Sequence, residues 1–260
     1  MKVVLFCGGM GMRLREYSET TPKPLVEVGP RPVLWHLMKY YAHYGHKDFI
    51  LCLGYGAHKI KEFFLRYDEW ATNDFVLAEG GRRVEMLGTD IDEWRITFVD
   101  TGAESNVGER LRRVQRFVGD EEVFLANYAD GLSDLPLDRY VESFLAQDRL
   151  ACFLSVPLPQ SFHVVHTDDH GDVIGLEPVA TSKLRINAGF FVLRREIFHY
   201  MKPGEELVVE PFARLVAENR LHAYAYDGFW RPMDTFKDKL ELDRICANGH
   251  APWQVWNRTE

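Results

Sequence analysis

The chain has 260 residues, of which 46% are hydrophobic and 27% charged, and these globular proportions exclude wholesale disorder. Its 31 basic and 39 acidic residues leave a net charge of −8 with neutral histidines, which argues against a nucleic-acid partner because binding phosphates requires a basic surface. No apolar run approaches the roughly 18 residues of a membrane span, and the four cysteines form no CxxC pair. We therefore expect a soluble, cytoplasmic protein that binds neither membranes nor nucleic acid.

Strand and helix patterns alternate through the first 150 residues. Short apolar runs bounded by glycine or polar residues predict four buried strands, at 2–7, 48–53, 95–99 and 122–126. Apolar residues at three- and four-residue spacing predict the helices between them, at 33–44, around 60–67 and at 107–117. Because crossovers between parallel strands are right-handed, this order predicts an open, mostly parallel sheet covered by helices on both faces. The solvent face of the third helix is expected to carry Arg110, Arg112, Arg113 and Arg116.

The second half of the chain is more irregular. Strand-like pieces are predicted at 151–156 and 188–193, and helical patterns return at 210–219 and 237–248. No repeat or linker divides the sequence, so we expect a single α/β domain over residues 1–260. The aromatic segment 251–256 is expected either to pack between subunits or to complete the core.

The turn after the first predicted strand contains Gly8, Gly9 and Gly11, followed by Arg13. Glycines let backbone N–H groups approach phosphate oxygens closely, and a guanidinium suits phosphate. The spacing matches neither GxGxxG nor the P-loop, so a tight strand-to-helix connection is the simpler interpretation of the turn alone. Lys23, between two prolines that stiffen its backbone, favours a phosphate contact over the usual solvated lysine.

Two acidic residues follow in loops. Asp130 comes just after the fourth predicted strand, and Asp234 precedes the last helical pattern. A carboxylate at a strand's carboxyl end can bind Mg²⁺, which prefers oxygen ligands. The alternative is structural, with Asp130 as a turn residue and Asp234 as a helix cap. Spacing alone leaves both interpretations open.

The chain contains seven motifs in this order: GGMGMRL, TPKPLVEVG, PVLWHLMKYY, ADGLSD, INAGFFVL, GFWRPMDT and APWQVW. They resemble the bacterial glucose-1-phosphate cytidylyltransferases, within the sugar-1-phosphate nucleotidyltransferases, over nearly the whole chain. The resemblance implies a Rossmann-like α/β nucleotidyltransferase fold, usually in a homo-oligomer. It implies that CTP and glucose 1-phosphate, with Mg²⁺, give CDP-glucose and pyrophosphate. Residues 1–150 would form the nucleotide-binding half, and residues 151–260 the sugar-binding half with the C-terminal helices.

The resemblance also implies roles for individual residues. The residues that match the family's nucleotide-binding positions are Gly8, Gly9, Gly11, Arg13, Lys23 and Arg110. The catalytic residues would be Arg13, Lys23 and Asp130, and the Mg²⁺ ligands Asp130 and Asp234. On the sugar side, the matching residues are Glu177 and Asn187.

The chain departs from the family pattern within the expected site. Met12 replaces a threonine, Val107 replaces a polar residue, and Pro178 replaces a lysine that contacts the sugar phosphate. Lys183 or Arg185, in the following loop, are the candidates to substitute for that lysine. Because Arg13, Lys23 and both aspartates remain, these departures favour an altered substrate over loss of function.

Two other functions stay open. The departures are compatible with a catalytically weak protein that binds a nucleotide or a sugar phosphate. A metal-dependent glycosyltransferase shares the Rossmann-like sheet and the strand-end aspartates, although the GGMGMRL and TPKPL motifs count against it. Release of pyrophosphate separates these functions from nucleotidyl transfer.

Overall fold

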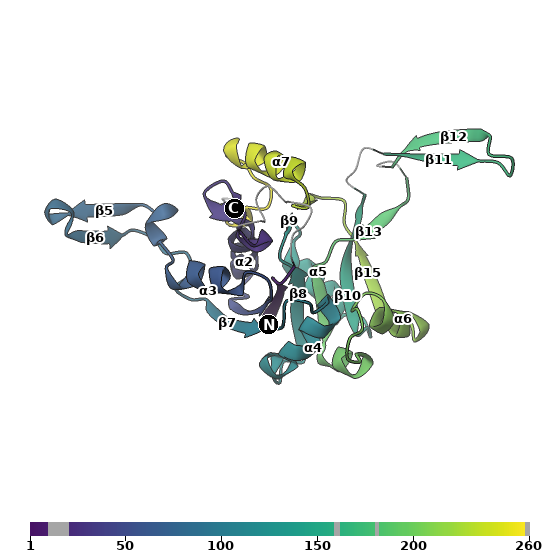
Figure 1. The fold of residues 1–260 in the computed structure, drawn as a ribbon, viewed down its shortest axis with the longest axis horizontal. Helices are drawn as coiled ribbons and strands as arrows, with labels where there is room; N and C mark the ends of the chain where they lie inside the picture. The colour runs from purple at the N-terminus through teal and green to yellow at the C-terminus, as the bar shows by residue number, and fades with distance from the viewer. Residues whose placement is uncertain (10–20, 159–161, 180–181, 258–260) are drawn as a thin grey trace.

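A long mixed β-sheet organises the fold (Figure 1). The computed structural model describes residues 1–9, 21–158, 162–179 and 182–257, and within these ranges the sheet has eight strands, in the order β13-β10-β14-β8-β1-β4-β7 with β15 also paired to β10. The strands are β1 (Lys2–Phe6), β4 (Asp48–Leu53), β7 (Arg95–Asp100), β8 (Val123–Tyr128), β10 (Ala151–Pro157), β13 (Arg185–Asn187), β14 (Phe191–Arg194) and β15 (Leu221–Ala225). β7, β4, β1 and β8 run parallel, whereas β14 runs antiparallel to β8 and β10. The predicted mostly parallel sheet is confirmed, with an antiparallel strand beyond β8.

Helices cover both faces of this sheet. Along β1, Val3 and Leu5 belong to one core cluster and Val4 and Phe6 to the other, as expected for a strand buried on both sides. The first cluster is covered by α2 (Val33–His43), α3 (Ala57–Leu65), α5 (Leu137–Leu145) and α7 (Phe236–Ala247), and the second by α4 (Val107–Val118), the 3-10 helix η6 (Arg195–Tyr200) and α6 (Glu210–Ala217). No helix in the described ranges combines the length and hydropathy that crossing a bilayer requires.

The strand predicted at 188–193 begins only at Phe191, with β14, and residues 188–190 separate it from β13. Gly189 and Phe190 have φ angles of 77° and 50°, values outside the strand region. The side chain of Asn127 stabilises this backbone conformation. Its Oδ1 accepts from the Phe190 amide at 2.9 Å, and its Nδ2 donates to the Tyr41 hydroxyl at 3.1 Å. β13 therefore ends at Asn187.

Two β-hairpins project from the body at opposite ends of its long axis (Figure 1). One pairs β5 (Phe75–Ala78) with β6 (Arg83–Met86), and the other pairs β11 (His163–Thr167) with β12 (Val173–Pro178). The remaining elements are short: η2 (Lys23–Leu25), β2 (Glu27–Val28), β3 (Arg31–Pro32), η3 (Glu69–Ala71), η4 (Glu79–Gly81), β9 (Gly131–Ser133), β16 (Trp230–Pro232) and η7 (Val255–Asn257). Neither hairpin was predicted from the sequence.

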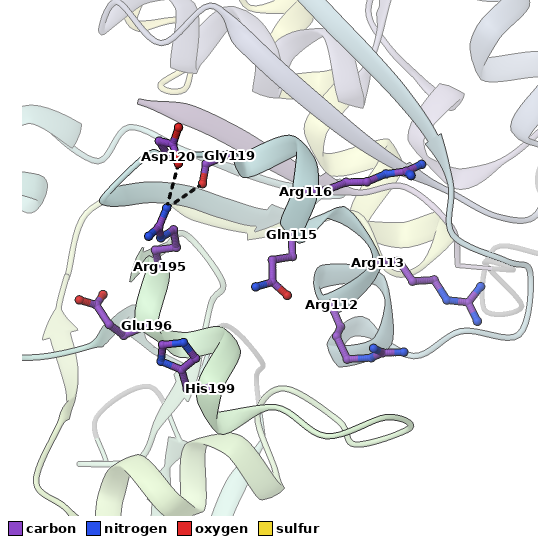
Figure 2. A pocket seen from close by; sticks show the side chains of 9 residues that line it. All are labelled: Arg112, Arg113, Gln115, Arg116, Gly119, Asp120, Arg195, Glu196 and His199. Carbon is purple, nitrogen blue, oxygen red and sulfur yellow. Dashed lines mark hydrogen bonds and ion pairs between the residues drawn. The ribbon is translucent and has the colours of Figure 1, made fainter.

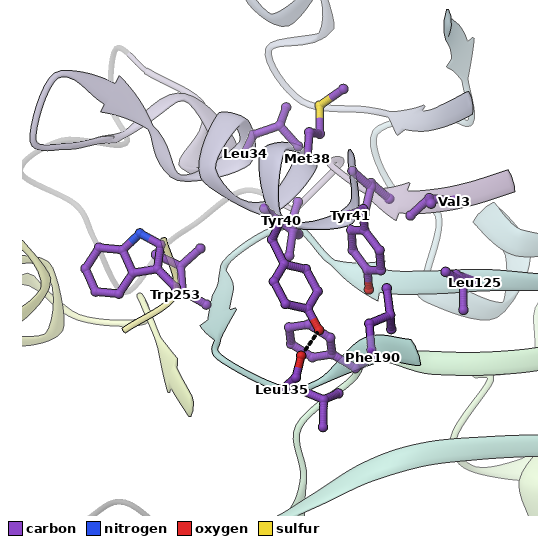
Figure 3. Close-up of a cluster of buried hydrophobic side chains, with 14 of the residues drawn as sticks. Val3, Leu34, Met38, Tyr40, Tyr41, Leu125, Leu135, Phe190 and Trp253 are labelled. Carbon is purple, nitrogen blue, oxygen red and sulfur yellow. Dashed lines mark hydrogen bonds between the residues drawn. The ribbon is translucent and has the colours of Figure 1, made fainter. Parts of the chain in front are cut away.

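Aromatic side chains of α2 form the centre of the first core cluster (Figure 3). Tyr40 and Tyr41 pack against Phe190, and the Tyr40 hydroxyl donates to the Leu135 carbonyl at 2.7 Å. Trp253, near the C-terminal end, is fully buried in the same cluster. The segment 251–256 therefore contributes to the core of the chain, one of its two expected roles.

A buried histidine makes the stability of this core depend on pH. His36 contacts the Val28 carbonyl through Nε2 at 2.8 Å and the Trp253 indole N–H through Nδ1 at 3.3 Å; because an indole only donates, Nδ1 accepts and Nε2 carries the proton. Burial lowers the pKa of His36 to about 4. As the pH falls from about 6.5 to about 4, the unfolded chain binds a proton that the folded chain does not, so the free energy of unfolding falls by about 3 kcal/mol.

Urea unfolding across this pH range measures the predicted loss. In His36→Gln, the part of the pH dependence that comes from His36 is expected to disappear, whatever the variant's stability at neutral pH. An equally steep fall in wild type and variant would contradict the assignment.

Candidate active site

Several residues predicted for the site lie at the edge of the sheet where the parallel strands have their carboxyl ends. Gly8 lies beyond β1, Gly54 follows β4, Thr101 follows β7 and Asp130 lies beyond β8. Open sheets of this kind bind ligands at this edge. The loops that follow the first four predicted strands therefore lie together, because these strands are parallel.

A short antiparallel pairing brings Asp234 to the same place. β16 pairs with β9 so that Pro232 lies opposite Gly131, and the Met233 amide donates to the Asp130 carbonyl at 2.8 Å. Thr235 caps α7, and its side chain and that of Asp238 form a capping box. Asp234 itself is therefore not the cap, which was its alternative role, and it lies beside Asp130.

Lys23 joins these two carboxylates. Its Nζ lies 2.5 Å from Asp130 Oδ2 and 2.7 Å from Asp234 Oδ1, with 14% of its side chain exposed. The backbone is fixed by η2, in which Pro24 is buried. Burial opposes the charge of Lys23, but the carboxylates of Asp130 and Asp234 outweigh it and raise the pKa of this lysine. The group is thus a charged lysine between two aspartates.

A cavity of about 330 Å³ adjoins the two aspartates. Asn187 and Trp230 contribute to its lining. Trp230 is 8% exposed, and its Nε1 is a buried donor without a hydrogen-bond partner in the described structure. Trp230 was not among the predicted site residues, although the motif GFWRPMDT contains it.

Arg110 lies inside the molecule, contrary to its predicted place on the solvent face of α4. It is 4% exposed, because it shares the inner face of the helix with Leu111, Val114 and Val118. Its guanidinium donates to five oxygens at the ends of three strands: those of Gly8, Leu53, Gly102 and Ala103, and Thr101 Oγ1, at 2.8–3.2 Å. Because both terminal nitrogens of Arg110 are bonded to these oxygens, the side chain positions the strand ends. Its contact with a nucleotide stays a prediction.

This arginine also explains two glycines. A Cβ on Gly8 would lie 2.1 Å from the Arg110 guanidinium, and one on Gly54 would lie 2.8 Å from it. Both positions therefore require glycine for packing. Gly9 is exposed and has open space around it. Gly11, Met12 and Arg13 lie outside the described residues.

The structure divides the residues predicted for the sugar side. Asn187 lines the cavity, whereas Glu177, Lys183 and Arg185 are not part of its lining. Glu177 lies on β12, with His166 Nε2 at 3.3 Å, and Lys183 is exposed. The Arg185 guanidinium donates to the Ser155 and Tyr226 carbonyls and pairs with Asp227. Its geometry therefore does not support the expectation that Arg185 replaces the lysine missing at Pro178.

Glu109, two residues after Val107, is paired with two arginines of the same helix. Its carboxylate accepts from Arg112 and Arg113 at 2.8–3.0 Å. These hydrogen bonds lower the pKa of Glu109 to about 2. Val107, the other departure in this segment, donates its amide to Glu206 at 3.3 Å as α4 begins.

The donor set at Asp130 and Asp234 fits a Mg²⁺ ion. Mg²⁺ is commonly held by one or two carboxylates together with waters and substrate phosphates. Two aspartates at a strand-end edge supply that pair. No group of three or more potential ligands among His, Cys, Asp and Glu is found in the described ranges, so a closed, all-protein metal site is not indicated there.

A larger cavity, of about 750 Å³, lies between α4 and η6 (Figure 2). Its lining includes Arg112, Arg116 and Arg195. Arg195 contacts the Gly119 carbonyl at 3.3 Å and Asp120 at 3.2 Å, at the carboxyl end of α4, where cations complement the helix dipole. Arg112 and Arg195 are paired with Glu109 and Asp120, whereas the predicted site residues Lys23, Asp130 and Asp234 meet at the other location.

Known proteins resemble this chain in sequence and in fold. The family model described as nucleotidyl transferase matches residues 2–244. The chain belongs to the nucleotidyl transferase family. One relative of this nucleotidyl transferase is a protein of Bacillus subtilis (strain 168) named probable glucose-1-phosphate cytidylyltransferase. The two chains are 36% identical over 258 residues, which cover 98% of this chain and all of the relative. A glucose-1-phosphate cytidylyltransferase of Salmonella typhi is 37% identical over 259 residues, with the same coverage.

The fold of the nucleotidyl transferase is found in solved structures as well. A putative glucose-1-phosphate thymidylyltransferase from Bacillus anthracis, in complex with a sucrose, has a TM-score of 0.71, with 100% of this chain and 98% of that chain covered and 18% identity. The predicted family and fold class are both confirmed.

Proposed function

We propose that this nucleotidyl transferase joins CTP to glucose 1-phosphate, giving CDP-glucose and pyrophosphate. The observation that carries the proposal is the meeting of Lys23, Asp130 and Asp234 beside a cavity that Asn187 also lines. The names of the relatives from B. subtilis and S. typhi support the choice of nucleotide and sugar.

The proposed reaction needs charge neutralisation more than proton transfer. A phosphate oxygen of the sugar 1-phosphate attacks the α-phosphorus of CTP, and pyrophosphate leaves in line. The second pKa of a phosphate monoester is about 6, so the nucleophile is ionised at neutral pH and needs no general base. Lys23 supplies a positive charge for phosphate oxygens. Mg²⁺, held by Asp130 and Asp234, would neutralise further phosphate charge.

We assign the two substrates to different parts of the strand-end edge. The nucleotide is assigned to residues 1–150, where Gly8 and Gly9 precede Gly11 and Arg13, and the sugar phosphate to residues 151–260 of a single domain. The cavity of about 330 Å³ beside Asn187 is within the usual size of small-molecule sites. Asp130 comes from the first of these ranges and Asp234 from the second.

Asn187→Ala tests the sugar assignment. Loss of one hydrogen bond to a bound sugar is expected to raise the KM for glucose 1-phosphate about tenfold, which corresponds to about 1.4 kcal/mol. The KM for CTP should stay unchanged. Because Asn187 Oδ1 also accepts from the Gly189 amide at 2.9 Å, thermal unfolding of the variant is the control. A higher KM for CTP, or no change in either KM, would contradict the assignment.

Tracing the α-phosphate distinguishes the alternative functions. With α-³²P-labelled CTP, glucose 1-phosphate and Mg²⁺, we expect the label in a nucleotide sugar and pyrophosphate in equal amount. A glycosyltransferase would consume a nucleotide sugar without releasing pyrophosphate, and a binding protein would retain CTP unchanged. Either result would refute the proposal.

The proposal includes a cytoplasmic homo-oligomer. The two projecting hairpins support assembly, because Leu77 and Ile174 on them are 61% and 69% exposed and exposed apolar patches mark interaction surfaces. The four cysteines are free thiols, which suits a reducing compartment.

A further inference from the structure

We propose that, in the free protein, Lys23 occupies the place of the divalent cation between Asp130 and Asp234, and that the cation binds both carboxylates only after a nucleotide phosphate has drawn the lysine away. The inference rests on the proposed function, because it takes the two aspartates as cation ligands. It adds an order of events: lysine and cation exclude each other, so nucleotide and cation load together.

The distances carry the first step. Lys23 Nζ lies 2.5 Å from one carboxylate oxygen and 2.7 Å from the other, so the ammonium group sits between the two groups that would hold the ion. Mg²⁺ binds its oxygen ligands at about 2.0–2.1 Å. An ion on the same two oxygens would therefore be forced against the ammonium group. Contact between two cations at this distance is strongly repulsive.

The balance of charge leads to the same conclusion. Two carboxylates and one ammonium group carry a net charge of −1, and the ammonium already donates a hydrogen bond to one oxygen of each carboxylate. Replacing the lysine with a divalent ion requires a new anionic partner for the displaced ammonium. A nucleotide triphosphate provides that partner, because its oxygens accept from a lysine with charge assistance.

The position of Lys23 suits such a movement. Its backbone is fixed in η2 between Pro22 and the buried Pro24, while its side chain ends at a partly exposed edge. The four-carbon stem of a lysine is flexible and carries rotatable donors. The ammonium group can therefore change partners while the backbone and both aspartates stay in place.

Titration of the full chain with Mn²⁺, without nucleotide, tests the exchange. Free Mn²⁺ is followed by electron paramagnetic resonance. Lys23→Met should bind Mn²⁺ at least tenfold more tightly than wild type, since removal of an adjacent like charge favours the cation. Lys47→Met, which removes the same charge before β4 at the opposite edge, is the matched control and should bind like wild type. The double variant Lys23→Met, Asp130→Asn should lose the gain.

Equal or weaker Mn²⁺ binding by folded Lys23→Met would overturn the proposal. If that variant does not fold, Lys23→Gln, which keeps a neutral donor at similar length, must show the same tightening, and its failure to do so overturns the proposal instead. The titration needs no turnover. Pyrophosphate release by wild type without tightening in the variants would refute the exchange alone, whereas tightening without release of pyrophosphate would refute the proposed function.

Discussion

Replacing Arg110 by methionine is expected to lower both stability and activity. The substitution leaves the carbonyls of Gly8, Leu53, Gly102 and Ala103 without this buried donor. Breaking a buried charged network of this kind costs about 3–5 kcal/mol, which lowers the melting temperature of a chain of this length by roughly 10 °C. Pyrophosphate release should fall as well, because the strand ends that lead into the nucleotide loop lose their common anchor.

Two further variants separate positioning from phosphate binding. Arg116→Met, on the same helix with its guanidinium beside the Phe117 ring, should change stability by no more than about 0.5 kcal/mol. Arg110→Lys should not restore stability, because one ammonium group does not replace a planar guanidinium that reaches five acceptors. A phosphate-binding role predicts the opposite result: unchanged melting of Arg110→Met with only a higher KM for CTP. Differential scanning calorimetry and initial rates together decide between the two roles.

The second large effect is expected for Asp130→Asn. The amide keeps the size of the carboxylate but removes the charge, so Mg²⁺-dependent turnover should fall by about a thousandfold or more, equivalent to about 4 kcal/mol of transition-state stabilisation. The melting temperature should change little, because Asp130 is 29% exposed and asparagine still accepts from Lys23. Turnover is measured as pyrophosphate release over a range of Mg²⁺ concentrations.

Asp120→Asn is the matched control for Asp130→Asn. Asp120 is fully exposed and precedes β8, at the opposite edge of the sheet, so the same loss of charge there should leave turnover unchanged. Wild-type turnover of Asp130→Asn at limiting Mg²⁺ would show that this aspartate is not a cation ligand.

The parallel part of the sheet, with Asp130 at the carboxyl ends of its strands, could be predicted from the sequence. Buried parallel strands have continuous apolar runs, and their carboxyl ends share one edge by topology. Asp234 was harder to place, because β16 brings it there by pairing with β9. No local pattern shows that pairing, and only the resemblance assigned the residue a role at the site.

The error at Arg110 has a physical cause. Arginine is rarely buried, so a helix with four arginines is naturally interpreted as having all of them on its solvent face. Position 110 nevertheless lies one turn from Val114 and two turns from Val118, on the inner side of α4. The oxygens that the guanidinium meets belong to Gly8, Leu53 and residues 101–103. These segments are far apart in the sequence, and their convergence is a property of the fold rather than of local spacing.

The two hairpins were missed for a related reason. Leu77, Val84, Ile174 and Leu176 are apolar but 53–69% exposed, so they pack on no core of this chain and give no signal of a buried strand. The place of Arg185 in the sequence makes it a candidate to replace the missing lysine, and this role stays a prediction. Its actual partners, Ser155, Tyr226 and Asp227, come from other segments.

The most direct test of the account is pyrophosphate release by the wild-type chain with Mg²⁺, in a matrix of CTP, UTP, dTTP, ATP and GTP against several sugar 1-phosphates. We predict the highest kcat/KM for CTP with glucose 1-phosphate. Turnover confined to another pair would contradict the proposed substrates and direct attention to residues 161–185. No release with any pair, despite CTP binding detected by calorimetry, would contradict the proposed reaction itself.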